Sequence, residues 1–162
     1  MIFVGLGLST ILVLSMPTLA VNKKARFDYE ILDTFEGGLK LTGAEVKSIK
    51  AGHIQLKGAF LHIQNGELIL KGSFVAPYKP AGNQEDYDSG ADRKVLVHKR
   101  ELNRLVGKKQ VEGLTIVPLS VYTKGGLIKL EFAVAKGKKK YEKRDALKKR
   151  DVDRDIRNKM KE

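Results

Sequence analysis

Apolar and polar residues alternate along several parts of the chain, and this period of two predicts β-strands with one buried face. Asn65-Gly66 is the strongest short hairpin signal, and Gly125-Gly126 predicts a second turn. Gly37-Gly38 lies inside the first run, where it predicts a turn or a bulge in a bent strand or strand pair. The predicted strands are 23–41, 56–63, 68–75, 115–122 and 127–135.

A short helix is predicted after the first strand, over residues 45–50. Thr42 is a suitable N-cap for it, because Glu45 follows three residues later as in a capping box. Ala51-Gly52 then ends the helix, since glycine is the usual residue just beyond a helix C-terminus.

A second helix is predicted over residues 95–106, with leucines on one side and Gly107 as its stop. Residues 77–92 combine prolines, glycines and acidic residues, which predicts a mobile surface loop. Five or six short antiparallel strands with two short helices make a mainly β fold. Closing such a sheet into a small barrel removes its unpaired edges, so we expect an antiparallel barrel over residues 21–135.

The segment 136–162 differs from the rest because it is dense in charge and poor in apolar residues. It holds 13 Lys or Arg and 6 acidic residues, so it carries +7 of the total net charge of +12. Acid-before-base pairs four residues apart favour a helix, but each contributes only about 0.2–0.5 kcal/mol. We therefore expect a basic tail that is disordered in the free protein and becomes helical on a partner.

The first twenty residues are uncharged and mainly apolar, and the first charged residue of the chain is Lys23. Three interpretations are open. The segment is a secretory signal, a marginal membrane anchor, or the artefact of a misplaced start, in which case translation begins at Met16. A signal normally has a positive segment before its apolar run, and none is present here. Residues 1–20 are therefore set apart from the fold. If they are real, the chain becomes a secreted or membrane-tethered cationic binding module.

Charge points to a polyanionic partner. Lys and Arg number 31 against 19 acidic residues, and the sequence pI is about 9.8. The chain has no cysteine, which excludes disulfides, thiolate zinc sites and cysteine nucleophiles. His53, His62 and His98 are scattered and match no metal or catalytic spacing. We therefore expect a nucleic-acid-binding protein that is no enzyme and holds no metal or cofactor.

Several ordered segments resemble the SsrA-binding protein family, also called small protein B. Residues 22–29 resemble its opening, 34–38 and 41–52 its signature, 93–102 its central motif and 135–144 the start of its tail. The resemblance runs in order from residue 22 to about residue 160.

The resemblance implies an oligonucleotide-binding-type (OB-like) barrel that holds the tRNA-like domain of transfer-messenger RNA (tmRNA). The complex would rescue stalled ribosomes and tag the unfinished peptide in trans-translation. The tail would enter the decoding centre and the empty mRNA channel. Implied partners are tmRNA, small-subunit rRNA and, through the RNA complex, elongation factor Tu. A cytoplasmic monomer without a small-molecule substrate is expected.

The resemblance also assigns residues to two sites. The RNA-binding residues of the barrel would be Glu36, Leu96 and His98, with phosphate contacts from Lys23, Lys24, Arg26, Lys47, Lys94 and Lys99. Because Glu36 is negative, its role must be hydrogen bonding to base or ribose groups. In the tail, Tyr141 would stack on an rRNA base. The remaining tail contacts would come from Lys138, Lys139, Lys140, Lys143, Arg144, Lys148, Lys149 and Arg150.

Overall fold

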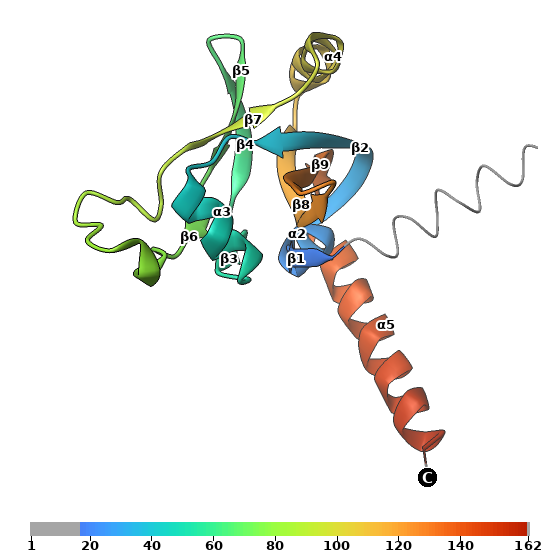
Figure 1. Cartoon of the computed structure of the whole chain (residues 1–162). Coiled ribbons are helices and arrows are strands. Elements are labelled where there is room, and N and C mark those ends of the chain that lie inside the picture. Colours follow the sequence, from blue (N-terminus) through green and yellow to red (C-terminus); the bar gives the residue numbers. More distant parts are fainter. Residues whose placement is uncertain (1–16, 162) are drawn as a thin grey trace, which may run out of the picture.

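A computed structural model describes residues 17–161 of the chain, and Figure 1 shows the order of its elements. Our interpretation of the leader falls mainly on residues 1–16, which lie outside the described residues. The elements in chain order are β1 (Thr18–Val21), α2 (Lys23–Asp28), β2 (Tyr29–Leu39), α3 (Gly43–Lys50), β3 (Ile54–Gln55), β4 (Phe60–Gln64), β5 (Glu67–Lys71), β6 (Phe74–Val75), the short 3-10 helix η1 (Lys79–Ala81), β7 (Arg93–Leu96), α4 (Lys99–Lys109), β8 (Leu114–Lys124), β9 (Leu127–Gly137) and α5 (Lys140–Lys159).

The main sheet closes on itself. Its strands pair in the order β8-β4-β5-β7-β2-β9, and β9 pairs again with β8. Every pairing is antiparallel, and Leu61 opposite Ile116 makes the contact between β4 and β8. Strand β1 adds to β8, with Val21 opposite Ser120. The prediction of a mainly β fold built on a small antiparallel barrel is confirmed.

One face of each long strand fills the barrel. Phe35 of β2 and Phe132 of β9 stack inside it with ring centroids 5.8 Å apart. Strand β8 is buried on both faces over 116–119, because α2 covers its outer side. That outer cluster contains Ala25 of α2 packed with Val117 and Leu119. Apolar side chains of α2 and of the outer face of the barrel thus hold α2 against the barrel.

Both predicted turns are present, and their backbones explain why glycine is needed. Asn65 and Gly66 have φ of 51° and 73°, and Gly125 and Gly126 have φ of 57° and 77°. Two consecutive positive φ values match the twist of the flanking strands. The first turn joins β4 to β5, and the second joins β8 to β9.

The start of the first predicted strand is wrong, because residues 23–28 form helix α2. Asn22 begins this helix: its Oδ1 accepts from the Ala25 N–H at 3.2 Å. Its Nδ2 donates to the carbonyls of Leu56 and Pro118, at 3.2 and 3.0 Å. A buried cap with all these partners overrides the alternating pattern. The bulge of β2 lies between Ile31 and Asp33, whereas Gly37-Gly38 continue the strand.

The helix predicted over 95–106 is wrong in its first part. Val95 belongs to β7, where it lies opposite Leu39 of β2 and Leu68 of β5. Because β7 pairs with β2 on one side and β5 on the other, the backbone N–H and C=O groups of all three strands find partners. A helix at this position would leave those groups of β2 and β5 without partners. The helix α4 starts at Lys99 and continues through Gly107 to Lys109, because a single exposed glycine weakens a helix without ending it.

Two further strands are shorter than predicted. Pairing over 56–63 starts only at Phe60, and Phe74–Val75 pair instead with Ile54–Gln55 in a separate two-stranded sheet. The helix after Thr42 is confirmed with its full capping box. The Thr42 side chain accepts from the Glu45 N–H at 3.2 Å, and the Glu45 carboxylate accepts from the Thr42 N–H at 2.9 Å.

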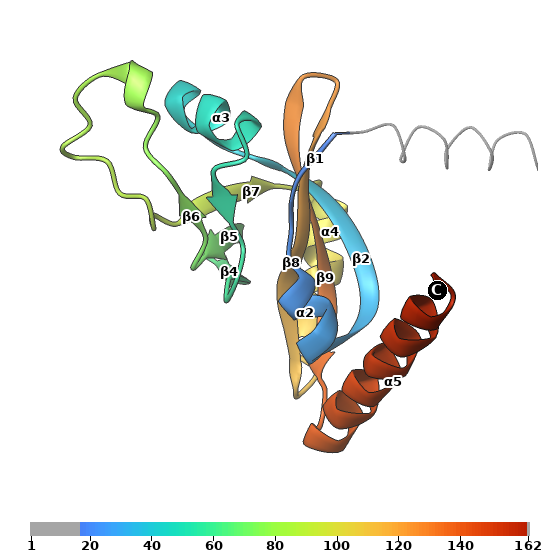
Figure 2. The same ribbon diagram turned by 90° about the horizontal axis from the view of Figure 1, so that it is seen from below.

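The tail forms one helix, α5, which extends away from the barrel in both views (Figures 1 and 2). None of its residues is buried. The expectation that the tail is disordered in the free protein stays a prediction. Over residues 17–161, no helix is both long and apolar enough to cross a membrane.

Candidate nucleic-acid interface

Glu36, Leu96 and His98 come from separate places in the sequence and line one open groove on the barrel. The groove has a volume of about 580 Å³. Glu36 lies on β2, Leu96 ends β7, and His98 lies just before α4. Leu96 is 51% exposed although it is a large apolar side chain. An exposed leucine beside a carboxylate and an imidazole offers both stacking and hydrogen bonding to an unpaired nucleotide.

Gly37 lines this groove, and it lies close to Val95, Leu96 and Val97. A Cβ at Gly37 would lie 2.7 Å from Val95 Cγ1, 3.0 Å from Val97 Cγ1 and 3.1 Å from the Leu96 carbonyl oxygen. A side chain at this position would force Val95, Val97 or the backbone at Leu96 to move. Glycine therefore lets the segment that carries Leu96 into the groove lie close to β2.

The Glu36 carboxylate is held by two donors from β8. The Tyr122 hydroxyl donates to Oε2, and Lys124 Nζ donates to Oε1 at 3.3 Å. Partial burial alone would raise the pKa of Glu36. The hydrogen bonds from Tyr122 and Lys124 and the positive charges of Lys124 and Lys129 outweigh it, so this pKa lies below its ordinary value. Glu36 is thus ionised at neutral pH and can only accept hydrogen bonds.

Among the groove residues that sequence reasoning missed are Leu127 and Lys129 on β9. Lys129 lies opposite Gly38 of β2, and Leu127 is 63% exposed at the β8–β9 turn. The polar position of Lys129 between the buried Ile128 and Leu130 was the available signal. This signal was insufficient, because alternation shows that a lysine faces outward but does not show that it lies opposite Gly38 at the groove.

Three of the predicted phosphate contacts lie near the groove but do not line it. Lys94 pairs with Glu67 of β5, and the exposed Lys99 begins α4. Both line a neighbouring hollow that includes Leu96. Lys47 lies on α3, where its Nζ is 5.7 Å from the centre of the Tyr78 ring.

The other three predicted phosphate contacts lie on α2. Lys23 and Lys24 are exposed and face the region of Lys57. Arg26 lies 3.8 Å from Glu131 of β9. The structure therefore brings Glu36, Leu96 and His98 together and divides the six basic residues between the groove's surroundings and α2.

The sequence profile of the family described as SmpB protein matches residues 19–162 of the chain. This chain belongs to the SmpB protein family. The SsrA-binding protein of Caldicellulosiruptor bescii is 50% identical over 144 residues, which cover 89% of this chain and 90% of that protein. The SsrA-binding protein of Persephonella marina is 47% identical over 148 residues, which cover 91% of this chain and 97% of that protein.

A solved structure described as "tmRNA-SmpB: a journey to the center of the bacterial ribosome" contains a chain with the same fold. It superimposes with a TM-score of 0.62 at 41% sequence identity. The match covers 79% of this chain and 93% of that chain. The fold of this SmpB-family member is therefore supported by both sequence and structure.

The tail of this SmpB-family chain is attached to α2. Lys143 Nζ lies 3.2 Å from Asp28 Oδ1, and the Arg150 guanidinium lies 5.6 Å from the centre of the Phe27 ring. Lys138 Nζ donates to the Arg26 carbonyl at 3.4 Å. Tyr141 is exposed and is available for stacking. The other predicted tail residues, Lys139, Lys140, Arg144, Lys148 and Lys149, are exposed as well.

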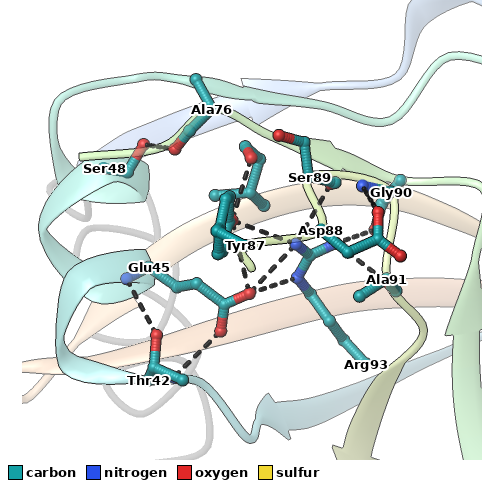
Figure 3. Close-up of polar contacts among 12 residues, drawn as sticks. Thr42, Glu45, Ser48, Ala76, Tyr87, Asp88, Ser89, Gly90, Ala91 and Arg93 are labelled. Carbon is teal, nitrogen blue, oxygen red and sulfur yellow. Dashed lines mark hydrogen bonds and ion pairs between the residues drawn. The ribbon is translucent and has the colours of Figure 1, made fainter. Parts of the chain in front are cut away.

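Arg93 opens the motif that resembles the family's central segment, yet its role in the structure is to support the fold (Figure 3). Its guanidinium lies 3.0 Å from the Glu45 carboxylate. It also donates to Ser73 Oγ at 3.2 Å and to the Ser89 carbonyl at 3.2 Å. The Tyr87 hydroxyl completes the network by donating to the Val75 carbonyl at 2.9 Å.

This network attaches loop 77–92 and α3 to the barrel. Burial raises the pKa of Tyr87, and the nearby Glu45 charge adds to that effect, so the phenol stays neutral and can donate. Among the residues that the structure describes, no group of His, Asp and Glu is arranged to hold a metal ion.

Proposed function

We propose that this chain binds the tRNA-like domain of tmRNA and delivers it to stalled ribosomes for trans-translation. One observation carries the proposal: Glu36, Leu96 and His98, which the family resemblance assigns to RNA, line a single groove. The names of the relatives and of the solved complex support tmRNA and the ribosome as partners. The barrel binds the RNA, and the chain itself catalyses no covalent reaction.

The groove suits a folded RNA better than a regular duplex. Its carboxylate repels phosphates but accepts hydrogen bonds from ribose and base groups. Its exposed leucines and histidine can contact an unstacked base. Lys94, Lys99 and Lys129 around this groove neutralise the neighbouring phosphates, which makes binding weaken as salt rises.

The tail is the part that we assign to the ribosome. A helix of the length of Lys140–Lys159 spans about 30 Å. Its exposed lysines and arginines suit a passage lined with phosphates, and Tyr141 near its start suits stacking on an rRNA base. We place Tyr141 and the neighbouring basic residues at the decoding centre and the rest of α5 in the empty mRNA channel. Elongation factor Tu joins through the RNA complex in the cytoplasm.

The first experiment recovers and sequences the RNA bound to the tagged full-length protein from cells. We expect tmRNA to be strongly enriched over an untagged control. No enrichment above background would reject the proposed function.

A second experiment separates the barrel from the tail. The Lys138 N–H donates to the Asp28 carbonyl at 2.8 Å, so a chain that ends after Lys138 keeps every strand of the barrel. We expect this chain to bind the tRNA-like domain within about twofold of the full chain and to lose ribosome rescue. Normal rescue by the short chain would contradict the role of the tail.

A matched pair of full-length variants tests charge in the tail. Neutralising Lys148, Lys149 and Arg150 with glutamine should strongly reduce rescue, because phosphate contacts are lost. Neutralising Asp151, Asp153 and Asp155 with asparagine changes the same stretch of α5 and should leave rescue intact or improve it. Equal losses in both variants would indicate a need for the helix alone.

A further inference from the structure

The carboxylate of Glu36 accepts a hydrogen bond from Tyr122, a residue that the proposed site does not include. We propose that Tyr122 is a positioning residue, which fixes the Glu36 carboxylate so that it reads hydrogen-bond donors of the RNA. This inference rests on the proposed function, since it concerns the same groove. It adds a residue on β8 and states which chemical groups of the RNA are recognised.

The geometry spans three strands. Glu36 lies on β2 and Tyr122 on β8, with β9 between them. Lys129 of β9 lies opposite both Gly38 and Tyr122. The half-buried tyrosine thus reaches across β9 to the Glu36 carboxylate. The bond from the Tyr122 hydroxyl to Glu36 Oε2 therefore fixes a long, mobile glutamate against a rigid ring.

The remaining capacity of the carboxylate defines its ligand. An ionised carboxylate offers about four acceptor positions and no donor. Tyr122 and Lys124 each occupy a position on a different oxygen. The free positions can be filled by a ribose 2′-hydroxyl or by a base N–H, whereas a phosphate diester has no proton to donate. Glu36 held in this way selects for RNA donors and against backbone phosphate.

Lys124 prevents the negative charge from weakening the binding of a polyanion. Its Nζ is 3.3 Å from Glu36 Oε1, and Lys129 of β9, which lines the same groove, adds a second positive charge nearby. These two cations attract the phosphates of the nucleotide being read. Tyr122 contributes no charge. Its pKa is raised by burial and by its bond to Glu36, so it remains a donor at any physiological pH.

Affinity measurements on full-length variants test the link between the two residues. We expect Tyr122→Phe to weaken binding of the tRNA-like domain about five- to tenfold, which is the usual size of the effect when one hydrogen bond is lost. Glu36→Gln should weaken it more. The double variant should bind no worse than Glu36→Gln alone, because Tyr122 acts only through Glu36. Losses that multiply would show that Tyr122 contacts the RNA itself and would overturn the inference.

Tyr29→Phe is the matched control. It removes the same hydroxyl from the start of the same strand β2 that carries Glu36, and we expect no change in affinity. Thermal unfolding of all variants checks that the fold is intact. If wild type fails to bind the tRNA-like domain better than an unrelated folded RNA, the proposed function fails. If wild type binds and Tyr122→Phe binds equally well, only the present inference fails.

Two arms with modified RNA identify the donor that Glu36 reads. One pool of the tRNA-like domain carries scattered 2′-deoxy substitutions, and a second carries inosine in place of guanosine, which removes the base amine. We expect one pool to show a position that weakens binding to wild type, weakens binding to Tyr122→Phe less, and has no effect on Glu36→Gln. The first pool indicates a ribose hydroxyl and the second a guanine edge. Interference that is identical for all three proteins in both pools would overturn the proposal.

The pH dependence of RNA affinity distinguishes a positioning tyrosine from one that only supports the fold. Loss of a purely structural tyrosine would leave this dependence unchanged. The hydrogen bond lowers the pKa of Glu36, so wild type keeps its ionised carboxylate, and its affinity, as the pH falls below the ordinary pKa. Without Tyr122 that pKa rises, and the loss of affinity moves to higher pH. Profiles that superimpose after scaling would contradict a positioning role.

Discussion

Glu45 and Glu36 each form an ion pair, but the first pair is buried and the second is exposed. Glu45 and Arg93 lie 3.0 Å apart with side chains that are 9% and 3% exposed. Glu36 and Lys124 lie 3.3 Å apart with side chains that are 39% and 49% exposed. The first pair is closed by protein partners on every side. The second lies at the open groove, and its carboxylate keeps acceptor positions that Tyr122 and Lys124 do not fill. The same chemistry therefore stabilises one region and leaves the other open.

Burial explains why the network around Arg93 is so complete. A buried guanidinium that lacked partners would cost several kcal/mol. Here its donors reach Glu45, Ser73 and Tyr87 together with the carbonyls of Ser89 and Ala91. An exposed pair has no such requirement, because water satisfies what the protein leaves open. The comparison predicts large effects on stability in the network and effects on binding in the groove.

The largest effect is expected for Glu45→Ala. This change leaves the Arg93 charge buried without its carboxylate, and it removes the capping box of α3. We expect the free energy of unfolding to fall by about 3–5 kcal/mol, measured by urea denaturation. A loss below about 1 kcal/mol would show that the network is not closed in solution.

Gly37→Ala should have the next largest effect, and it tests where the barrel ends and the groove begins. The new methyl group would lie 2.7 Å from Val95 Cγ1 and 3.1 Å from the Leu96 carbonyl oxygen, so the Val95 side chain or β7 itself must shift. We expect a loss of about 1–3 kcal/mol of stability, typical of overpacking, together with weaker RNA binding because Leu96 moves. Gly38→Ala is the control, since its nearest neighbour would be Leu96 Cβ at an ordinary 3.8 Å. Equal losses of stability for the two variants would contradict the role of Gly37.

Glu36→Gln should reverse the pattern of Glu45→Ala. The side chain is exposed, so we expect the free energy of unfolding to change by less than about 0.5 kcal/mol. Affinity for the tRNA-like domain should fall tenfold or more, because an amide presents a donor where the RNA also donates. Binding titrations and urea denaturation of the same sample check both halves. A stability loss comparable to that of Glu45→Ala would remove the distinction between the two glutamates.

Local signals in the sequence predicted much of the barrel. Asn65-Gly66 specified a hairpin, because consecutive positive φ values leave few alternatives. Thr42 with Glu45 specified the start of α3, because the cap involves only neighbours in sequence. The family resemblance named Glu36, Leu96 and His98, which the structure brings to one groove. Their contact with RNA stays a prediction.

What the sequence did not predict depends on distant partners. Residues 23–28 alternate like a strand, and only the contacts of Asn22 with Leu56 and Pro118 make them a helix. Residues 95–106 contain leucines at helical spacing, but pairing with β2 and β5 draws their first part into β7. Tyr122 is one polar position among several on β8. Its bond to Glu36 crosses β9 and leaves no local signal.

Asp28→Asn should have the smallest effect and sets the baseline for the comparison. Asp28 pairs with Lys143 of α5 at 3.2 Å near the surface, where salt and water weaken ion pairs. We expect a change of at most about 0.5 kcal/mol in the free energy of unfolding, and less at high salt. Asp92→Asn, which removes the exposed pair with Lys71 at 3.0 Å, is the matched control away from the tail. If Asp28→Asn alone lowers the helix content measured by circular dichroism, the pair holds α5 in place. A partly exposed ion pair would then order the tail without stabilising the barrel.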